Sequence, residues 1–279
     1  MTLTPNAPSW LLPRSTAPDR TASYLSVQDA GKTYDGRSGA VQAVAHADFD
    51  IEEGDFVSLV GPSGCGKSTL MSMIGGLEAP STGRIRVGGT PVDGPRRDFG
   101  YVFQDATLLP WKSVLDNVLF PIRAHRRPVA EFRPEAERLL RLTGLWDFRD
   151  KRPAELSGGM RQRVAICRGL IHDPRLLLMD EPFSALDAIT RDDMNLALAR
   201  LWDQQQRRTA VFITHSIREA VLLSDRVLVM NARPSRIVAD IRVPLARPRH
   251  AGLQEDPVFN QICAFVRDRI HEGHGERQA

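Results

Sequence analysis

A glycine-rich loop constrains the fold of this chain more than any other feature. Residues 61–69 read Gly-Pro-Ser-Gly-Cys-Gly-Lys-Ser-Thr, between an apolar, β-favouring run at 56–60 and a segment at 67–71 that can open a helix. In a P-loop of this kind, backbone amides cradle phosphates, a lysine reaches the outer two phosphates and a hydroxyl binds magnesium. The pattern predicts a nucleoside triphosphate site made by Gly61, Pro62, Ser63, Gly64, Cys65, Gly66, Lys67, Ser68 and Thr69.

Two adjacent carboxylates follow a second apolar run. Asp180 and Glu181 end the continuous run 176–179, which is typical of a parallel strand buried on both faces. Open α/β sheets bind ligands at the carboxyl ends of such strands. We expect Asp180 to hold magnesium through water and Glu181 to polarise the attacking water as general base.

A third motif lies between these two. Residues 156–162 read Leu-Ser-Gly-Gly-Met-Arg-Gln, and Ser157 is placed to cap the helix that follows. Ser157, Gly158 and Gly159 would offer a hydroxyl and exposed amides at a helix N-terminus, which is a favourable place for an anion. Together with the P-loop, this motif predicts a second surface that reads phosphate.

Strands alternate with helices along much of the chain, which predicts an α/β fold with a parallel sheet. Over about 24–60, short β-rich runs separated by turns predict an antiparallel layer that leads into the P-loop strand. Helical spacing over 113–124 and 133–143 predicts a helical subdomain inserted at about 105–156, and further helices are expected over 190–206 and 257–270. We expect a disordered leader at 1–22, the catalytic domain at 23–243, and a C-terminal helix and tail at 244–279.

Composition excludes several classes of protein. The 279 residues carry 37 basic and 34 acidic side chains, and a net charge of +3 is too small to indicate nucleic acid binding. No apolar stretch approaches the roughly 18 residues of a membrane span. The three cysteines are far apart and lack a ligand pattern, so neither a disulfide framework nor a zinc site is predicted.

Taken in order, the motifs resemble those of the ATP-binding subunits of ABC transporters, and the resemblance covers residues 24 to about 243. The matching features are the P-loop at 61–69, Gln104 after a strand, the signature at 156–162, the pair Asp180 and Glu181, the run Ser-Ala-Leu-Asp at 184–187, and His215 after a strand. The resemblance implies a P-loop ATPase core with parallel sheet, antiparallel β layer and helical subdomain, which binds ATP and Mg²⁺ and hydrolyses ATP.

The resemblance also implies roles for single residues. Gln104 would contact magnesium and the attacking water, and His215 would contact the γ-phosphate and position water. Tyr34 would stack on adenine, or else be a packed side chain. In the family two copies form a head-to-tail dimer, so that the signature of one copy completes the ATP site of the other, and Asp187 would lie across that interface.

Two segments resemble the nitrate, sulfonate and taurine importer group: Leu-Leu-Pro-Trp at 108–111 and Ala-Arg-Pro-Ser-Arg-Ile at 232–237. This implies a subunit peripheral to the cytoplasmic face of the membrane, bound to integral membrane permease subunits through the region 105–111 and served indirectly by an external solute-binding protein. Uptake of a sulfonate, taurine or nitrate-like anion is the expected function. The alternatives are another importer subgroup, export, or a non-transport ABC ATPase acting on DNA or in translation.

Overall fold

The computed structural model describes residues 23–36, 39–203 and 208–275. The chain folds as two compact units, the first formed by Met1–Pro95 with Thr209–Ala279 and the second by Arg96–Arg208. The expected leader at 1–22 and the last four residues of the tail lie outside the described residues. Within the described residues no helix has the length and apolar character needed to span a membrane.

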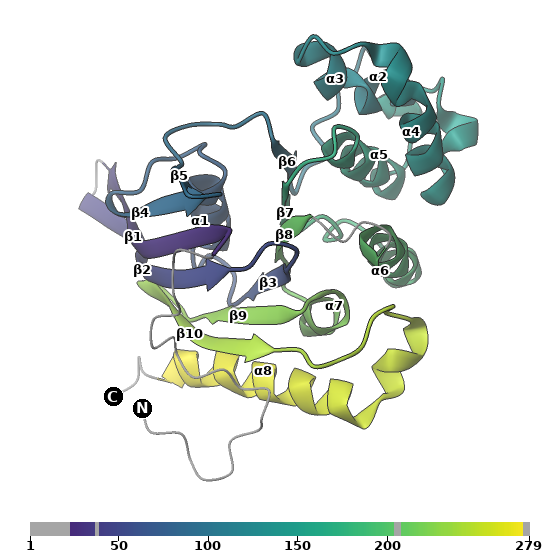
Figure 1. Ribbon diagram of the computed structural model, residues 1–279. Coiled ribbons are helices and arrows are strands. Elements are labelled where there is room, and N and C mark those ends of the chain that lie inside the picture. The colour runs from purple at the N-terminus through teal and green to yellow at the C-terminus, as the bar shows by residue number, and fades with distance from the viewer. Residues whose placement is uncertain (1–22, 37–38, 204–207, 276–279) are drawn as a thin grey trace. The chain divides into compact units, whose positions relative to one another are not determined.

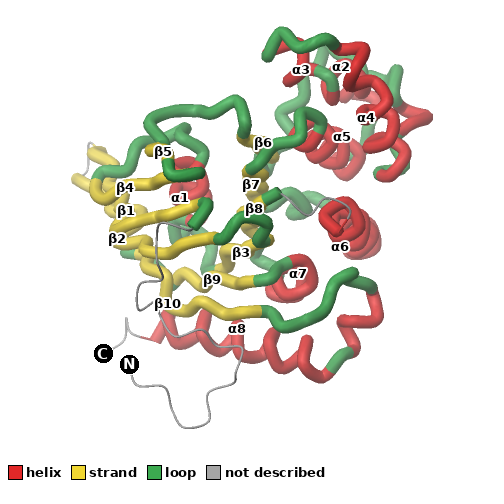
Figure 2. The backbone as a smooth tube through the Cα atoms, in the orientation of Figure 1, coloured by secondary structure: helices red, strands yellow, loops and turns green. Residues whose placement is uncertain are grey.

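An antiparallel ladder forms one part of the first unit (Figures 1 and 2). Its strands are β1 (Leu25–Gly36), β2 (Gly39–Ile51), β4 (Thr82–Val87) and β5 (Thr90–Pro91), with β1 paired to both β2 and β4. One antiparallel pair is therefore built from the segment 24–60 that was expected to form such a layer. The register of β1 shifts three times against β2, which marks bulges in this pair.

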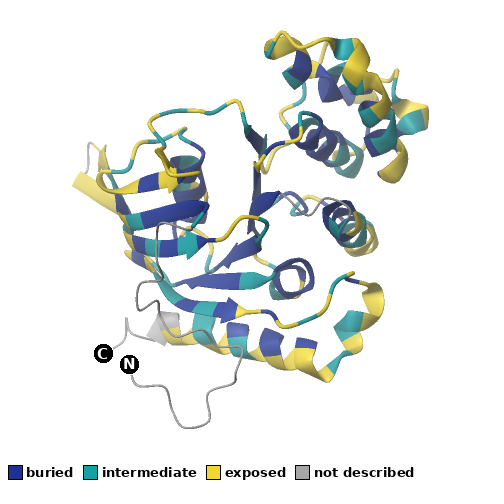
Figure 3. Ribbon diagram, in the orientation of Figure 1, coloured by how far each residue is buried: buried dark blue, intermediate teal, exposed yellow. Residues whose placement is uncertain are grey.

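The P-loop strand lies in the parallel part of the first unit. β3 (Phe56–Val60) pairs in parallel with β8 (Thr209–Ile213) on one side and β9 (Arg226–Met230) on the other, and β10 (Ser235–Arg242) continues from β9 to β2. The strand order in this unit is β5-β4-β1-β2-β10-β9-β3-β8. All residues of β3 and β8 are buried (Figure 3), as expected for central strands covered on both faces.

Four helical elements complete the first unit: α1 (Lys67–Ile74), α7 (Ile217–Leu223), the 3₁₀ turn η3 (Ala251–Glu255) and α8 (Pro257–Gly275). Helix α8 buries Phe259, Ile262 and Val266 in a cluster with residues of α7, β9 and β10. These side chains recur every three or four residues, which places them on one helix face. The predicted helix at 257–270 is present and extends to Gly275.

The second unit combines two parallel strands with most of the helices. β6 (Phe99–Val102) pairs with β7 (Leu176–Asp180), and α5 (Gly158–Leu170) packs against β6 and α2. The remaining elements are α2 (Val114–Val118), α3 (Phe120–Ala124), α4 (Val129–Leu142), the 3₁₀ turns η1 (Trp146–Phe148) and η2 (Pro153–Glu155), and α6 (Ala188–Asp203).

Helix boundaries differ from the expected ones at several places. The segment 113–124 forms two short helices, because Pro121 lacks the amide that would continue the hydrogen-bond ladder of α2 into α3. Helix α4 begins at Val129, four residues before the expected start at 133. Helix α6 ends at Asp203, and the predicted continuation at 204–206 lies outside the described residues.

Candidate active site

The P-loop joins the carboxyl end of β3 to the first turn of α1. Two of its glycines leave no room for a side chain: a Cβ atom on Gly66 would lie 2.6 Å from the Ala43 carbonyl oxygen, and one on Gly61 would lie 2.5 Å from that of Met230. Gly66 also has φ of 104°, which L-residues rarely adopt. The tight loop therefore depends on glycine at these two positions.

Lys67 lies at the start of α1 and points back along the loop. Only 5 % of the residue is exposed, and its Nζ donates to the carbonyl oxygens of Gly61 (2.9 Å) and Pro62 (3.0 Å). The ammonium group is thus held at the mouth of the loop by neutral acceptors rather than by a carboxylate. Ser68 follows it with an exposed side chain.

His215 shares a sheet edge with the P-loop. The parallel register aligns Leu59 of β3 with Ile213 of β8, and the Thr214 amide donates to the Leu59 carbonyl oxygen. Parallel strands end at the same edge, so the loop after β3 and His215 after β8 emerge side by side. The first unit therefore brings His215 and the P-loop together, and the side chain of His215 is exposed.

The carboxylates of Asp180 and Glu181 lie at the carboxyl ends of the parallel strands in the second unit. Asp180 is the last, buried residue of β7, and Glu181 follows with a positive φ of 44°. Its carbonyl oxygen accepts hydrogen bonds from the amide (3.1 Å) and hydroxyl (3.0 Å) of Ser184. A non-glycine residue in this conformation is strained and is held by its surroundings.

Gln104 emerges beside this pair. The register of β6 with β7 aligns Val102 with Met179, so the next residues of the two strands lead to Gln104 and Glu181 at one edge. The side chain of Gln104 is exposed. The second unit thus brings Gln104, Asp180 and Glu181 together.

Helix α5 fastens the segment that carries Gln104. Gln162 Nε2 donates to the Phe103 carbonyl oxygen (3.0 Å), and Arg168 donates to the carbonyl oxygens of Ala106 (2.8 Å) and Thr107 (2.8 Å). Sequence reasoning assigned no role to either side chain. Gln162 stands inside the signature motif, whereas no sequence signal marks Arg168 as a contact of this segment.

A buried asparagine holds the next part of the same segment. Asn117 has no exposed surface; its Oδ1 accepts from the Leu109 amide (2.7 Å), and its Nδ2 donates to the carbonyl oxygens of Leu109, Lys112 and Ser113. Trp111, within this clamp, is 67 % exposed. The sequence signal that could have predicted this role is an asparagine among the apolar residues of α2.

The signature motif forms the N-terminus of α5. The hydroxyl oxygen of Ser157 caps the helix by accepting from the Met160 amide (3.2 Å), and Gly158 and Gly159 begin the first turn. Ser157 and Gly158 are exposed. The positive end of the helix dipole and free amides therefore face solvent, as an anion site requires.

Asp187 and Tyr34 each make a contact with a residue nearby in the sequence. Asp187 Oδ1 accepts from the Thr190 amide (3.0 Å) at the start of α6, and this bond lowers the pKa of the carboxyl. Tyr34 lies on β1 with 39 % of its surface exposed and with Lys32 Nζ 5.1 Å from its ring centre. Neither contact prevents the role that the resemblance implies.

The cysteines are free and buried. Burial raises the pKa of the Cys65 thiol, although Lys67 opposes the shift, and raises that of Cys167 to about 11. A protonated, enclosed thiol is a poor nucleophile. The side chain of Cys65 therefore fills space in the loop and offers no reactive thiolate.

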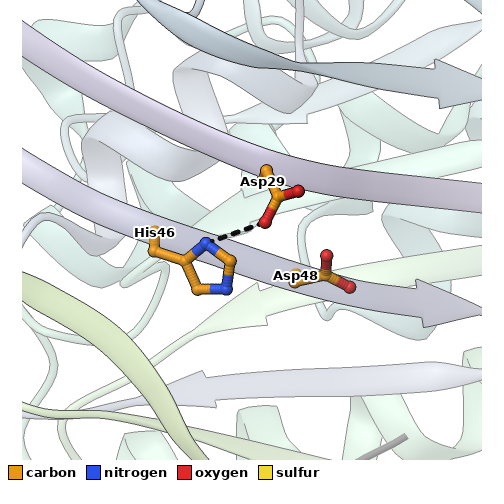
Figure 4. Close-up of side chains that lie close together, drawn as sticks. All are labelled: Asp29, His46 and Asp48. Atoms are coloured by element: carbon orange, nitrogen blue, oxygen red, sulfur yellow. Dashed lines mark ion pairs between the residues drawn. The ribbon is translucent and has the colours of Figure 1, made fainter. Parts of the chain in front are cut away.

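Three further side chains gather on the antiparallel strands (Figure 4). Asp29 of β1 and His46 of β2 form an ion pair of 3.0 Å, and Asp48 lies beside them with its donor atom within 4.8 Å of the others. Asp29 and His46 are 73 % and 48 % exposed, so the pair adds little stability. None of the three belongs to the motifs described above.

Known proteins share both the motifs and the fold. A family model described as ABC transporter matches residues 44–184. The taurine import ATP-binding protein TauB of Ruegeria pomeroyi is 44 % identical over 225 residues, covering 80 % of this chain and 84 % of the relative. The nitrate import ATP-binding protein NrtD of Synechococcus elongatus is 39 % identical over 261 residues, covering 92 % and 95 %.

A solved structure agrees with these relatives. The ATP-binding cassette MJ0796, described as a dimer in a post-hydrolysis state bound to ADP and Pi, superposes with a TM-score of 0.71 at 30 % identity. The match covers 80 % of this chain and all of that chain. The α/β fold with parallel and antiparallel strands is therefore the one that the sequence predicted.

Proposed function

Because the chain belongs to the ABC transporter family, as the ATP-hydrolysing subunit of an importer, we propose that it energises the uptake of a small solute: a sulfonate, taurine or a nitrate-like anion. The relatives named for taurine and nitrate support this substrate class. We further propose that it works at the cytoplasmic face of the membrane, bound to permease subunits that receive solute from an external binding protein.

The observation that carries the catalytic proposal is the pair of strand registers. Leu59 opposite Ile213 sets His215 beside the P-loop, and Val102 opposite Met179 sets Gln104 beside Glu181. Each register brings a phosphate-binding or water-activating group next to a second group that can orient the reaction. In the proposed site Glu181 takes a proton from the attacking water, Gln104 orients that water, and His215 contacts the γ-phosphate.

The remaining groups of the proposed site bind the nucleotide or magnesium and take no part in proton transfer. Lys67 and the loop amides neutralise phosphate charge, and Tyr34 stacks on adenine. The oxygen donors that suit Mg²⁺ are the hydroxyl of Ser68, the amide oxygen of Gln104 and the carboxylate of Asp180. Asp180 lies at the buried end of β7. Magnesium bound there would neutralise charge developing on the phosphates.

We propose that two copies bind ATP between them head to tail. The exposed N-terminus of α5 supports this, since Ser157, Gly158 and Gly159 can meet the γ-phosphate held by the P-loop of the partner copy. Asp187 would lie at the same interface. The solved cassette described as a dimer is a precedent in the family.

The region 105–111 is proposed to contact the permease. Exposed Trp111 supports this role, because the backbone around it is held by Asn117 on one side and by Arg168 on the other. A rigidly held loop can transmit motion that a flexible loop would absorb. Through Gln162, the same segment is fastened to the helix that begins with the signature.

Catalytic variants test the proposal. Glu181→Gln should reduce ATP hydrolysis about 10²- to 10⁴-fold and trap an ATP-bound dimer on size exclusion. Lys67→Ala should lower hydrolysis about 10²-fold or more, because phosphate charge is no longer compensated. A Glu181→Gln protein that stays monomeric in saturating ATP and turns over normally would contradict both the general-base and the dimer proposals.

A test of the substrate class requires the assembled transporter. The subunit should be placed in vesicles with its own permease, and hydrolysis measured while the binding protein is added with taurine, alkanesulfonates or nitrate. Stimulation by one of these anions supports the proposal and identifies the solute. A fast rate that none of them changes argues for a different solute class or for export.

A further inference from the structure

A pocket in the second unit is lined by three arginines, two histidines and two aspartates. It has a volume of about 590 Å³, and its lining residues are Arg97, Asp98, His125, Arg127, His172, Asp173 and Arg175. They come from the segment before β6, the link between α3 and α4, and the turn between α5 and β7. All of them belong to one compact unit, so the pocket is built within it.

The pocket lies at the opposite edge of the second unit from the candidate active site. Arg97 and Arg175 precede the amino ends of the parallel strands β6 and β7, whereas Gln104 and Glu181 follow the carboxyl ends. His172 follows α5, whose other end carries the signature. A helix of 13 residues is about 20 Å long, so an anion here would not be in the signature site.

Both carboxylates of the lining are already neutralised by arginines outside it. Arg96 makes two hydrogen bonds to Asp98 (3.0 and 2.7 Å), and this pairing lowers the pKa of Asp98. Arg208 donates to Asp173 at 2.7 Å. Both acids thus have their hydrogen-bond partners outside the lining, and Asp98 in addition interacts with the charge of Arg175 at longer range.

The guanidinium groups that line the pocket lack acidic partners at salt-bridge distance. In the described part of the chain, no carboxylate lies within salt-bridge distance of Arg97, Arg127 or Arg175, and Arg127 only stacks on the Phe132 ring at 4.3 Å. Three adjacent cations repel one another, so a bound anion would relieve an unfavourable charge. Guanidinium groups also match phosphate oxygens in pairs.

Two histidines of the lining contact each other beside the arginines. The rings of His125 and His172 meet edge to face with centres 5.7 Å apart. Burial lowers the pKa of His172 most, and His125, Arg208 and Arg127 lower it further, against a hydrogen bond with the Phe99 carbonyl oxygen. An anion among these cations would raise the pKa of His172, and the contact between the two rings makes both of them reporters of binding.

From these observations we infer that the pocket binds a small soluble phosphate-type oxyanion with at least two negative charges, through Arg97, Arg127 and Arg175. This is a second anion site, separate from the P-loop and from the signature. The volume also admits water beside the anion. The inference is independent of the proposed transport function.

Histidine NMR of the full chain tests it, with inorganic pyrophosphate as probe at constant ionic strength. Of the seven histidines, His125 and His172 would be assigned with single glutamine variants, and His215 reports separately on binding at the P-loop. We expect the His125 and His172 signals to shift saturably and the pKa of His172 to rise. Nitrate and taurine, with one negative charge at most, should bind more weakly.

Matched variants decide whether the arginines hold the anion. The double change Arg127→Gln and Arg175→Gln should weaken binding about tenfold or more, since charge-assisted hydrogen bonds are lost. Arg133→Gln, an exposed change on α4, should bind as the unmodified protein does. Arg97→Gln provides a second, single test should the double variant be unstable.

Three outcomes would overturn the inference. The first is a His215 shift with no shift of His125 or His172 over the same pyrophosphate range. The second is equal affinity in the arginine variants and in the unmodified protein. The third is an equal response to chloride or nitrate, which would indicate general screening rather than a site for a multiply charged oxyanion.

Discussion

Thr214 donates its hydroxyl hydrogen to Glu219 Oε2 at 2.6 Å, and this buried pair flanks the turn that carries His215. The Thr214 hydroxyl oxygen also accepts from the Ser216 amide at 3.0 Å. Both bonds fix the backbone on either side of His215, whose own side chain is exposed. The backbone that carries the histidine is thus held by two buried side chains.

Thr214→Val should therefore impair both stability and catalysis. The substitution preserves shape but leaves the buried Glu219 carboxylate and the Ser216 amide without this partner, which should cost about 1–3 kcal/mol of unfolding free energy. Urea denaturation measures this cost, and ATP hydrolysis should fall because His215 is less well fixed. Thr214→Ser keeps the hydroxyl and should retain most of the stability and most of the ATP hydrolysis. If the serine variant loses as much of each as the valine variant, packing rather than the hydrogen bonds matters here.

Glu181→Gly should stabilise the chain while abolishing its activity. Glycine adopts the positive φ of residue 181 without the penalty that glutamate carries, so unfolding free energy should rise by about 1 kcal/mol. Glu181→Gln is the matched control, because it removes the base but keeps the strain. Chemical denaturation of both would be compared, and equal midpoints would mean that the conformation at this position costs nothing.

Asn117→Ala should release the backbone around Trp111. Four hydrogen bonds to residues 109–113 are lost from a fully buried side chain, which should cost about 3 kcal/mol. Hydrogen exchange should show that the Leu109 amide loses protection. Val118→Ala, which removes apolar volume from the same helix, should lower stability but leave that amide protected; loss of protection in both variants would point to general loosening of α2.

Arg168→Gln should uncouple the permease from hydrolysis. Arg168 fixes Ala106 and Thr107 without belonging to the proposed catalytic groups, so the subunit alone should keep its basal rate. In the assembled transporter, solute-stimulated hydrolysis should fall about tenfold, within the usual range of coupling free energies. Arg141→Gln, which breaks a surface ion pair with Glu137 and a stacking contact with the Trp146 ring, is the control. Stimulation unchanged in Arg168→Gln would remove the coupling role.

Alkaline pH should destabilise the chain through its buried thiols. Burial raises the pKa of Cys167 to about 11 from 9.0, so the folded state favours the neutral thiol. The stabilisation is complete below pH 9 and is lost as pH rises toward 11, by about 2 kcal/mol. The stability difference between unmodified protein and Cys167→Ala should shrink by this amount over that range, whereas the difference for Ile166→Val should stay constant.

The motifs were predictable because each is a local backbone geometry. The loop at 61–66 needs its glycines to turn between β3 and α1, and Ser157 caps the helix directly after it. The apolar runs before Gly61 and Asp180 predicted the two buried strands. Helix limits were less accurate where proline intervened, since Pro121 divides a segment whose apolar spacing is continuous.

The amino-acid sequence by itself determined the chemistry of the site, because the P-loop, the acidic pair and the signature each consist of neighbouring residues. Only the tertiary structure decided which distant segments hold the backbone around these groups in place. Gln162 and Phe103 are 59 residues apart, Arg168 and Thr107 are 61 apart, and the arginines of the pocket come from three separate segments. Periodicity reports which face of an element is buried, but the partner of a buried or clamping side chain is set by strand register and helix packing, which form only when distant segments meet.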